Sequence, residues 1–178
     1  MSQPLDVLTV GNAIVDIFAR CDDAFLEARD IGKGMMNLVD APRSAALYAD
    51  ITDAREISGG SAANTAVGVA ALGGRAGFAG RVHDDVLGHS FIGDIGAAGV
   101  QFTTPPQTDG APTASSIILV TPDAIRSMNT HLGACIEFQP DDIRPQEVAA
   151  SNVIYPDGYL ADAPSGPERC AQAARPAG

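Results

Sequence analysis

Short apolar runs alternate along the chain with segments whose apolar residues recur at helical spacing. Such runs are typical of buried strands, and the recurring spacing is typical of amphipathic helices. Strands are expected at residues 5–10, 14–19, 35–39, 76–80, 113–120, 126–132 and 153–155, and helices at 22–29, 43–50, 62–72, 85–97 and 145–150. This alternation predicts an α/β fold, with a parallel sheet and helices on its faces.

Four of the expected strands do not fit a simple alternation of strand and helix. The segments 113–120 and 126–132 follow one another through a turn near Thr121-Pro122-Asp123, which predicts a hairpin. The early segments 14–19 and 35–39 are also additional to the alternation. One face of the strand 126–132 is expected to carry Arg126, Met128, Thr130 and Leu132.

A pair of glycines precedes the Ala-rich helical segment at 62–72. A short segment ending in Glu56-Ile57 runs into Gly59 and Gly60, where the missing Cβ lets the backbone approach a ligand closely. The first amides of the helix point at that ligand, and Asn64 adds donor and acceptor groups. The pattern favours a site for a polyhydroxylated small molecule, although a tight turn alone also explains two glycines. It matches neither GxGxxG nor GxxxxGK[ST].

A second polar element follows the first expected strand. The run 5–10 leads into Gly11-Asn12, and Asp16 lies shortly after it. Ligands of open α/β sheets bind beyond the carboxyl ends of the strands, which is where Asn12 and Asp16 are expected. A carboxylate there accepts hydrogen bonds from neighbouring hydroxyls. The alternative is that Asp16 is a solvated loop acid or a helix cap.

Together these elements resemble the PfkB (ribokinase-like) family of carbohydrate and nucleoside kinases, and within it the bacterial adenosine-kinase-like members. The resemblance extends from about residue 5 to about residue 160. It rests on the segments 10–16 (VGNAIVD), 57–66 (ISGGSAANTA), 72–76 (LGGRA), 79–88 (AGRVHDDVLG) and 126–134 (RSMNTHLGA). One position departs from the family signature, because His83 stands where glycine is expected, whereas Asp85 and Gly88 are in place.

The resemblance implies a ribokinase-like three-layer α/β/α fold with a mostly parallel sheet and a small β lid. Residues 1–178 would form a single N-terminal portion of it, truncated relative to the family. The lid would comprise about residues 14–20, 35–39 and 102–132, covering the sugar site and, in some members, forming a homodimer surface. The residues implied to bind the acceptor are Asn12, Asp16, Gly59, Gly60, Asn64, Met128, Thr130 and Leu132.

Arg126 would lie near the transferred phosphate, where a guanidinium neutralises developing charge. Without the resemblance, Arg126 is equally well explained as a solvated charge at a hairpin end. Met128 and Leu132 are then better explained as core residues.

The implied reaction is transfer of a phosphoryl group from ATP, with Mg²⁺, to a hydroxyl of a sugar or nucleoside. The family's catalytic base lies in a late Gly-Ala-Gly-Asp loop, and an Asn-x-x-Glu motif binds metal; neither motif occurs here. We therefore expect the acceptor-binding half without the catalytic base, which alone would be inactive and poorly soluble.

The alternatives are a non-catalytic sugar- or nucleoside-binding module and an inactive fragment. A Rossmann oxidoreductase is disfavoured because GxGxxG is absent after the first strand. Asn12 before Asp16 and the apolar lid positions favour adenosine, and ribose or another furanose stays open.

A net charge of -11 and a pI near 4.4 disfavour nucleic acid and anionic membranes as partners. No run approaches the roughly 18 apolar residues of a membrane span, and no signal peptide is visible, so a cytoplasmic location is expected. The scattered cysteines are expected as free thiols: Cys21, Cys135 and Cys170. Surface or turn positions, without metal ligation, are expected for His83, His89 and His131. The pair Asp84-Asp85 is expected at a helix N-terminus.

Overall fold

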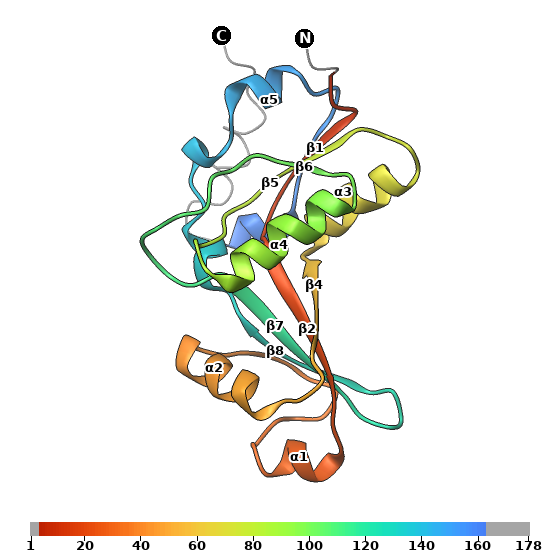
Figure 1. Ribbon diagram of the computed structural model, residues 1–178, viewed down its shortest axis with the longest axis vertical. Helices are drawn as coiled ribbons and strands as arrows, with labels where there is room; N and C mark the ends of the chain where they lie inside the picture. The colour runs from red at the N-terminus through yellow and green to blue at the C-terminus, as the bar shows by residue number, and fades with distance from the viewer. Residues whose placement is uncertain (1–3, 163–178) are drawn as a thin grey trace.

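The computed structural model describes residues 4–162, which form two β-sheets in the upper and lower parts of the molecule as drawn in Figure 1. The first sheet has four strands in the order β6-β5-β1-β9, and every neighbouring pair in it is parallel. The second has five strands in the order β3-β8-β7-β2-β4 and is mixed. The predicted α/β fold with a mostly parallel sheet is confirmed.

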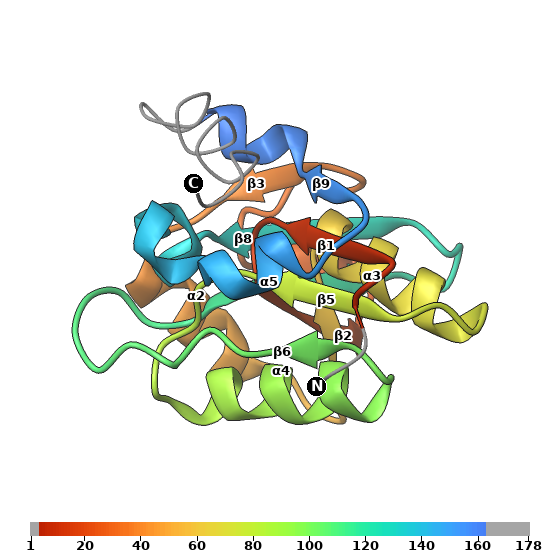
Figure 2. The same cartoon turned by 90° about the horizontal axis from the view of Figure 1, so that it is seen from above.

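Helices and short segments cover the two faces of the four-stranded sheet (Figure 2). Its strands are β1 (Val7–Val10), β5 (Ala76–Ala79), β6 (Gln101–Phe102) and β9 (Ile154–Pro156). One face packs against α3 (Ser61–Ala71) and α4 (Val86–Ala97). The other face packs against the chain segment that contains η1 (Gly133–Glu137), η2 (Pro140–Asp142), α5 (Pro145–Ala149) and η3 (Gly158–Asp162).

Three phenylalanines form the centre of the contact between α4 and this sheet. The ring centroids of Phe78, Phe91 and Phe102 are separated by 5.7, 5.8 and 5.6 Å. The rings of Phe78 and Phe91 are fully buried. Large rings at such separations combine apolar burial with favourable aromatic geometry, so this cluster fixes α4 on the sheet.

The five-stranded sheet is covered on one face by α2 (Ala41–Asp50). Its strands are β2 (Ile14–Arg20), β3 (Met36–Leu38), β4 (Arg55–Gly59), β7 (Ala114–Val120) and β8 (Arg126–His131). The predicted hairpin is confirmed, because β7 and β8 pair antiparallel. On the covered face, Ser44 Oγ of α2 lies 3.1 Å from Ser115 Oγ of β7, at hydrogen-bond distance. The short helix α1 (Asp23–Glu27) follows β2 and is capped by Asp22.

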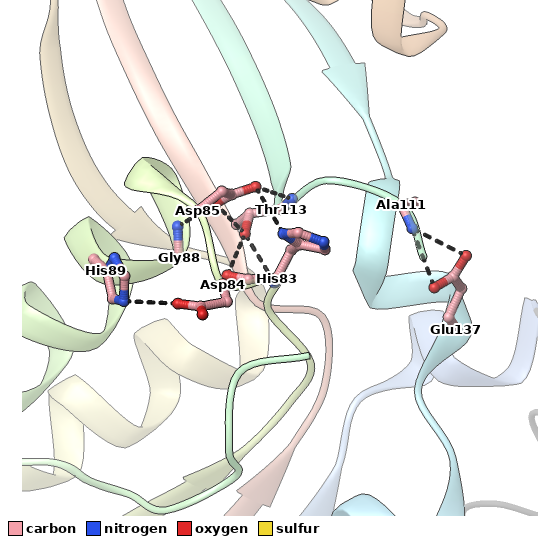
Figure 3. A network of polar contacts seen from close by, with 8 residues as sticks. All are labelled: His83, Asp84, Asp85, Gly88, His89, Ala111, Thr113 and Glu137. Atoms are coloured by element: carbon pink, nitrogen blue, oxygen red, sulfur yellow. Dashed lines mark hydrogen bonds and ion pairs between the residues drawn. The ribbon is translucent and has the colours of Figure 1, made fainter. Parts of the chain in front are cut away.

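The carboxylate of Asp85 connects α4 of the upper part to β7 of the lower part (Figure 3). It caps α4 by accepting a hydrogen bond from Gly88 N at 2.7 Å. It also accepts from Thr113 N at 2.9 Å and from Thr113 Oγ1 at 2.7 Å. His83 N donates to Thr113 Oγ1 at 3.0 Å, so the turn forms with histidine in place of glycine. The expected helix N-terminal role of Asp85 is confirmed.

The structure differs from the sequence pattern in two strands. β4 begins with a charged pair and ends in glycine; it pairs antiparallel with β2 and so belongs to the five-stranded sheet. β6 has two residues, too few to produce a pattern. Because Phe102 of β6 pairs with Phe78, the predicted lid segment 102–132 begins in the four-stranded sheet, and its start is wrong.

The phenylalanine cluster predicts a large difference between two positions of α4. Replacing Phe91 by alanine removes a ring with no exposed surface, and we expect unfolding to become easier by about 3–5 kcal/mol. Val86→Ala alters a side chain that is 78% exposed and should change stability by less than about 0.5 kcal/mol. Urea unfolding followed by circular dichroism measures both. Equal losses in the two variants would contradict the cluster's role.

Candidate functional site

The carboxyl ends of β1 and β9 lie beside the segment that carries Asn12. Gly11 follows β1, and its N–H donates to Ala79 O at 3.1 Å. A Cβ on Gly11 would lie 2.6 Å from Ala62 Cβ, so the chain here passes directly beside the first turn of α3. Asn12 is partly exposed at this edge. This is the edge at which ligands of open α/β sheets bind.

Asp16 lies against Gly59, which is distant from it in the sequence. Asp16 is in register with Ile57 of β4, two residues before Gly59. A Cβ on Gly59 would lie 2.4 Å from Asp16 Oδ2, which is closer than two such atoms can approach. The carboxylate therefore occupies the space that a side chain at residue 59 would take. The structure thus brings together two elements that are distant in the sequence: the segment that carries Asp16 and the glycine pair at residues 59–60.

Gly60 makes a comparable contact with the backbone of Asn12. Its φ of 99° lies in a region that L-residues rarely adopt, and a Cβ there would lie 2.2 Å from Asn12 O. α3 begins at the next residue. Asn64 lies one turn into the helix, with its N–H donating to Gly60 O at 2.9 Å and its side chain exposed.

Burial raises the pKa of Asp16 from 3.8 to about 6, because desolvation disfavours the charged form. No cation contributes to this shift. Near neutral pH the group is a carboxylate, and its oxygens accept no hydrogen bond from residues 4–162. Hydroxyl groups of a ligand would supply donors.

A row of polar side chains extends from Asp16 across three strands. Ser116 of β7 is in register with Asp16, and Thr130 of β8 is in register with Ser116. The Oγ of Ser116 and the Oγ1 of Thr130 lie 2.9 Å apart, at hydrogen-bond distance, so the two side chains share a face. We call Asp16, Ser116 and Thr130 the acceptor row. The sequence predicts Thr130 as a site residue, whereas Ser116 becomes visible only through the strand register.

The next residue pairs along these strands are apolar. Phe18, Ile118 and Met128 are in register with one another, so Met128 lies on the same face as the acceptor row, as predicted. Arg126 begins β8 on this face and is exposed. The prediction that Leu132 shares this strand face is wrong, since β8 ends at His131 and Leu132 precedes η1 with helical backbone angles.

Asp157 is a buried acid at this edge that the sequence reasoning does not identify. It follows β9, its N–H donates to Val10 O at 2.8 Å, and it is 5% exposed. Its carboxylate accepts hydrogen bonds from Ser61 Oγ at 2.5 Å and from Tyr159 N at 3.1 Å. Asp157 is therefore hydrogen-bonded to Ser61, the first residue of α3. Its position directly after the last expected strand, like that of Asn12 after the first, is the signal that points to it.

Histidines and cysteines take no part in a metal cluster within residues 4–162. His89 Nε2 lies 3.0 Å from Asp84 Oδ1, which gives it a carboxylate partner that its sequence spacing does not reveal (Figure 3). Cys21 and Cys135 are free thiols. Cys170 lies outside the described residues.

Comparison with known proteins gives a family and several relatives. Residues 31–177 match the description "pfkB family carbohydrate kinase". A probable sugar kinase from Rhizobium etli CFN 42 is 51% identical, with a TM-score of 0.84 over 97% of this chain and 53% of that chain. Adenosine kinase from Sinorhizobium meliloti is 54% identical, with a TM-score of 0.83 over 96% of this chain and 53% of that chain.

A more distant relative is 5-dehydro-2-deoxygluconokinase from Photobacterium profundum. It is 26% identical over 166 residues, or 92% of this chain and 44% of the relative. The chain spans about half the length of the relatives it matches. Among the described residues, no helix is both long enough and apolar enough to span a membrane.

The close contact at Gly60 predicts opposite effects of alanine at two positions. Gly60→Ala forces an unfavourable φ and a clash with Asn12 O, and should cost roughly 2–4 kcal/mol of stability. Gly68→Ala, within α3, meets no atom within 4 Å and should stabilise by roughly 0.5–1 kcal/mol. Thermal unfolding of the two variants provides the measurement. A neutral Gly60→Ala would show that the turn does not need glycine.

The raised pKa of Asp16 predicts how its charge affects stability. The folded chain binds this proton more tightly than the unfolded chain, so stability falls as pH rises from about 4 through about 6. Asp16→Asn has no charge to desolvate. We expect it to exceed the wild type at pH 7.5 by on the order of 1 kcal/mol, allowing for partial exposure, and to match it near pH 4.

Urea unfolding at the two pH values measures this difference. The matched control is Asp109→Asn, at an exposed position in the loop before β7, which should follow the wild type at both. A destabilised Asp16→Asn variant at pH 7.5 would contradict the assigned cost of burial.

Proposed function

The chain belongs to the pfkB family of carbohydrate kinases, and we propose that it forms the acceptor-binding part of an ATP-dependent phosphotransferase. The acceptor is the hydroxyl of a nucleoside or sugar, and adenosine is the preferred candidate. The observation that carries this proposal is the contact between Asp16 and Gly59, which leaves a partly buried carboxylate at the end of the acceptor row. Such a carboxylate binds two neighbouring hydroxyls of a furanose ring.

The apolar residues beside the acceptor row support a nucleoside over a free sugar. Phe18, Ile118 and Met128 lie in register on the same face and offer a surface of the kind on which a purine ring packs. The 54% identity to a protein named adenosine kinase supports the same choice. In this proposal the site is completed by Asn12, Gly60 and Asn64.

The five-stranded sheet is proposed as the lid over this site. Its edge strand β3 exposes Met36 and Leu38, which are 56% and 64% exposed. Apolar side chains on an unpaired edge are unusual at a free surface and support pairing of two copies through the lid.

ATP belongs to the proposal as the source of the phosphoryl group, and Mg²⁺ as the ion that would screen charge on its phosphates. The residues present do not fit a metal site, since no three suitable ligands lie together within residues 4–162. We therefore assign no step to a metal or a base in this chain. Arg126, exposed on the acceptor face, is proposed to neutralise charge on the phosphoryl group.

Calorimetric titration with adenosine and with ribose tests the proposal. The wild type should bind adenosine, and Asp16→Asn should weaken binding about tenfold or more, since charge-assisted hydrogen bonds are lost. Lowering the pH from 7.5 to 5 should weaken wild-type binding about tenfold, because a carboxyl group of pKa about 6 is then mostly protonated.

Asp109→Asn is the control, and it should retain both the affinity and the pH dependence. Unchanged affinity in Asp16→Asn would remove the proposed role of Asp16. An assay for ATP-dependent phosphorylation then separates a catalytic chain from a binding module, since the module binds adenosine without turnover.

A further inference from the structure

Three arginines lie at the far end of the five-stranded sheet, on the face that also carries Asp16. Val120 is in register with Arg20 on one side and Arg126 on the other, so both arginines point to the face of Val120. Arg55 is in register with Phe18, two residues before Arg20. It is therefore a diagonal neighbour of Arg20, at roughly 7–8 Å. Arg126 is already assigned to the phosphoryl group of the acceptor reaction, so we call the other two, Arg20 and Arg55, the arginine cluster.

The arginine cluster has no acidic partner among residues 4–162. Several other cations form ion pairs: Arg29 with Asp50, Lys33 with Asp23 and Asp123, and Arg75 with Asp6. The whole chain has 22 acidic and 11 basic residues, so carboxylates are abundant. Two neighbouring positive charges that form no ion pair within residues 4–162 repel one another. An arrangement of this kind gains stability when it binds an anion.

Two hollows adjoin the arginine cluster and give an anion room to bind. One, of about 500 Å³, is lined by Phe18, Ala19, Arg20, Thr52, Asp53, Arg55 and Val120. The other, of about 430 Å³, is lined in part by Arg20, Val120 and Thr121. The first hollow has two arginines against one acid, Asp53.

We propose that the arginine cluster is a binding site for a phosphate group, separate from the acceptor row. Arginine presents a planar fork of N–H donors that matches the oxygens of phosphate. Thr52 adds a hydroxyl to the same hollow. The ligand is inorganic phosphate or the phosphate group of a nucleotide, which share this chemistry.

The site is independent of the proposed acceptor site. Arg20 lies four residues beyond Asp16 on β2, roughly 13 Å along the strand. That distance exceeds the screening length of about 8 Å at physiological ionic strength. Phosphate binding therefore does not require Asp16, and adenosine binding does not require Arg20 or Arg55.

Calorimetric titration with inorganic phosphate at low ionic strength tests this site. The wild-type chain should bind phosphate, and each of Arg20→Gln and Arg55→Gln should weaken binding about tenfold, the effect of losing one charge-assisted hydrogen bond. The control is Arg144→Gln, an exposed arginine at the start of α5, which changes net charge equally. Absence of phosphate binding to the wild type, or equal losses in Arg144→Gln, would overturn the proposal.

Two further measurements identify the anion and show that the variants fold. Titration of Asp16→Asn with AMP, in which the acceptor row is impaired, reports on a nucleotide phosphate. Affinity for AMP above that for inorganic phosphate, lost in the Arg20→Gln and Asp16→Asn double variant, indicates a nucleotide, whereas equal affinities indicate the phosphate group alone. Adenosine affinity should be unchanged in Arg20→Gln and Arg55→Gln. Retained adenosine binding with retained phosphate binding would overturn the site while leaving the acceptor proposal intact.

Discussion

The backbone at Gly59 and Gly60 lies so close to two other segments that neither position has room for a side chain. Asp16 Oδ2 and Asn12 O occupy the positions that the two Cβ atoms would take. This contact fixes the end of β4, the start of α3 and the segment after β1 relative to one another. Because β4 belongs to one sheet and α3 covers the other, the same contact also determines where the two sheets meet.

A second contact between the upper and lower parts of the molecule is made by side chains and not by closely packed backbone. The backbone approach at the glycines excludes side chains, whereas Asp85 joins α4 to the start of β7 through side-chain hydrogen bonds. A carboxylate that caps a helix and accepts two bonds from Thr113 has its oxygens satisfied within the protein. The carboxylate of Asp16 accepts no such bond within residues 4–162, which makes it a candidate binding group. The partners of each acid thus distinguish a structural carboxylate from a candidate binding one.

The sequence predicts most of the strands and helices because their apolar periodicity is strong. Asp40 and Asp85 cap helices close to their expected starts, and Asp16 comes to lie against the glycine turn as the two motifs suggest. β4 and β6 are harder to predict, because a five-residue polar strand and a two-residue strand are stabilised by their neighbours rather than by their own pattern. Ser116 and Asp157 depend on register and on contacts between distant segments, which one sequence does not encode visibly.

The two ends of the acceptor face are electrostatically separate. Burial alone raises the pKa of Asp16, with no contribution from an arginine, although three arginines share its sheet face. An arginine near Asp16 would instead lower that pKa and compete with hydroxyls for its oxygens. Separation along the strands by the apolar row of Phe18, Ile118 and Met128 avoids this competition. The face is therefore proposed to present a carboxylate to hydroxyls at one end and guanidinium groups to an anion at the other, with neither neutralising the other.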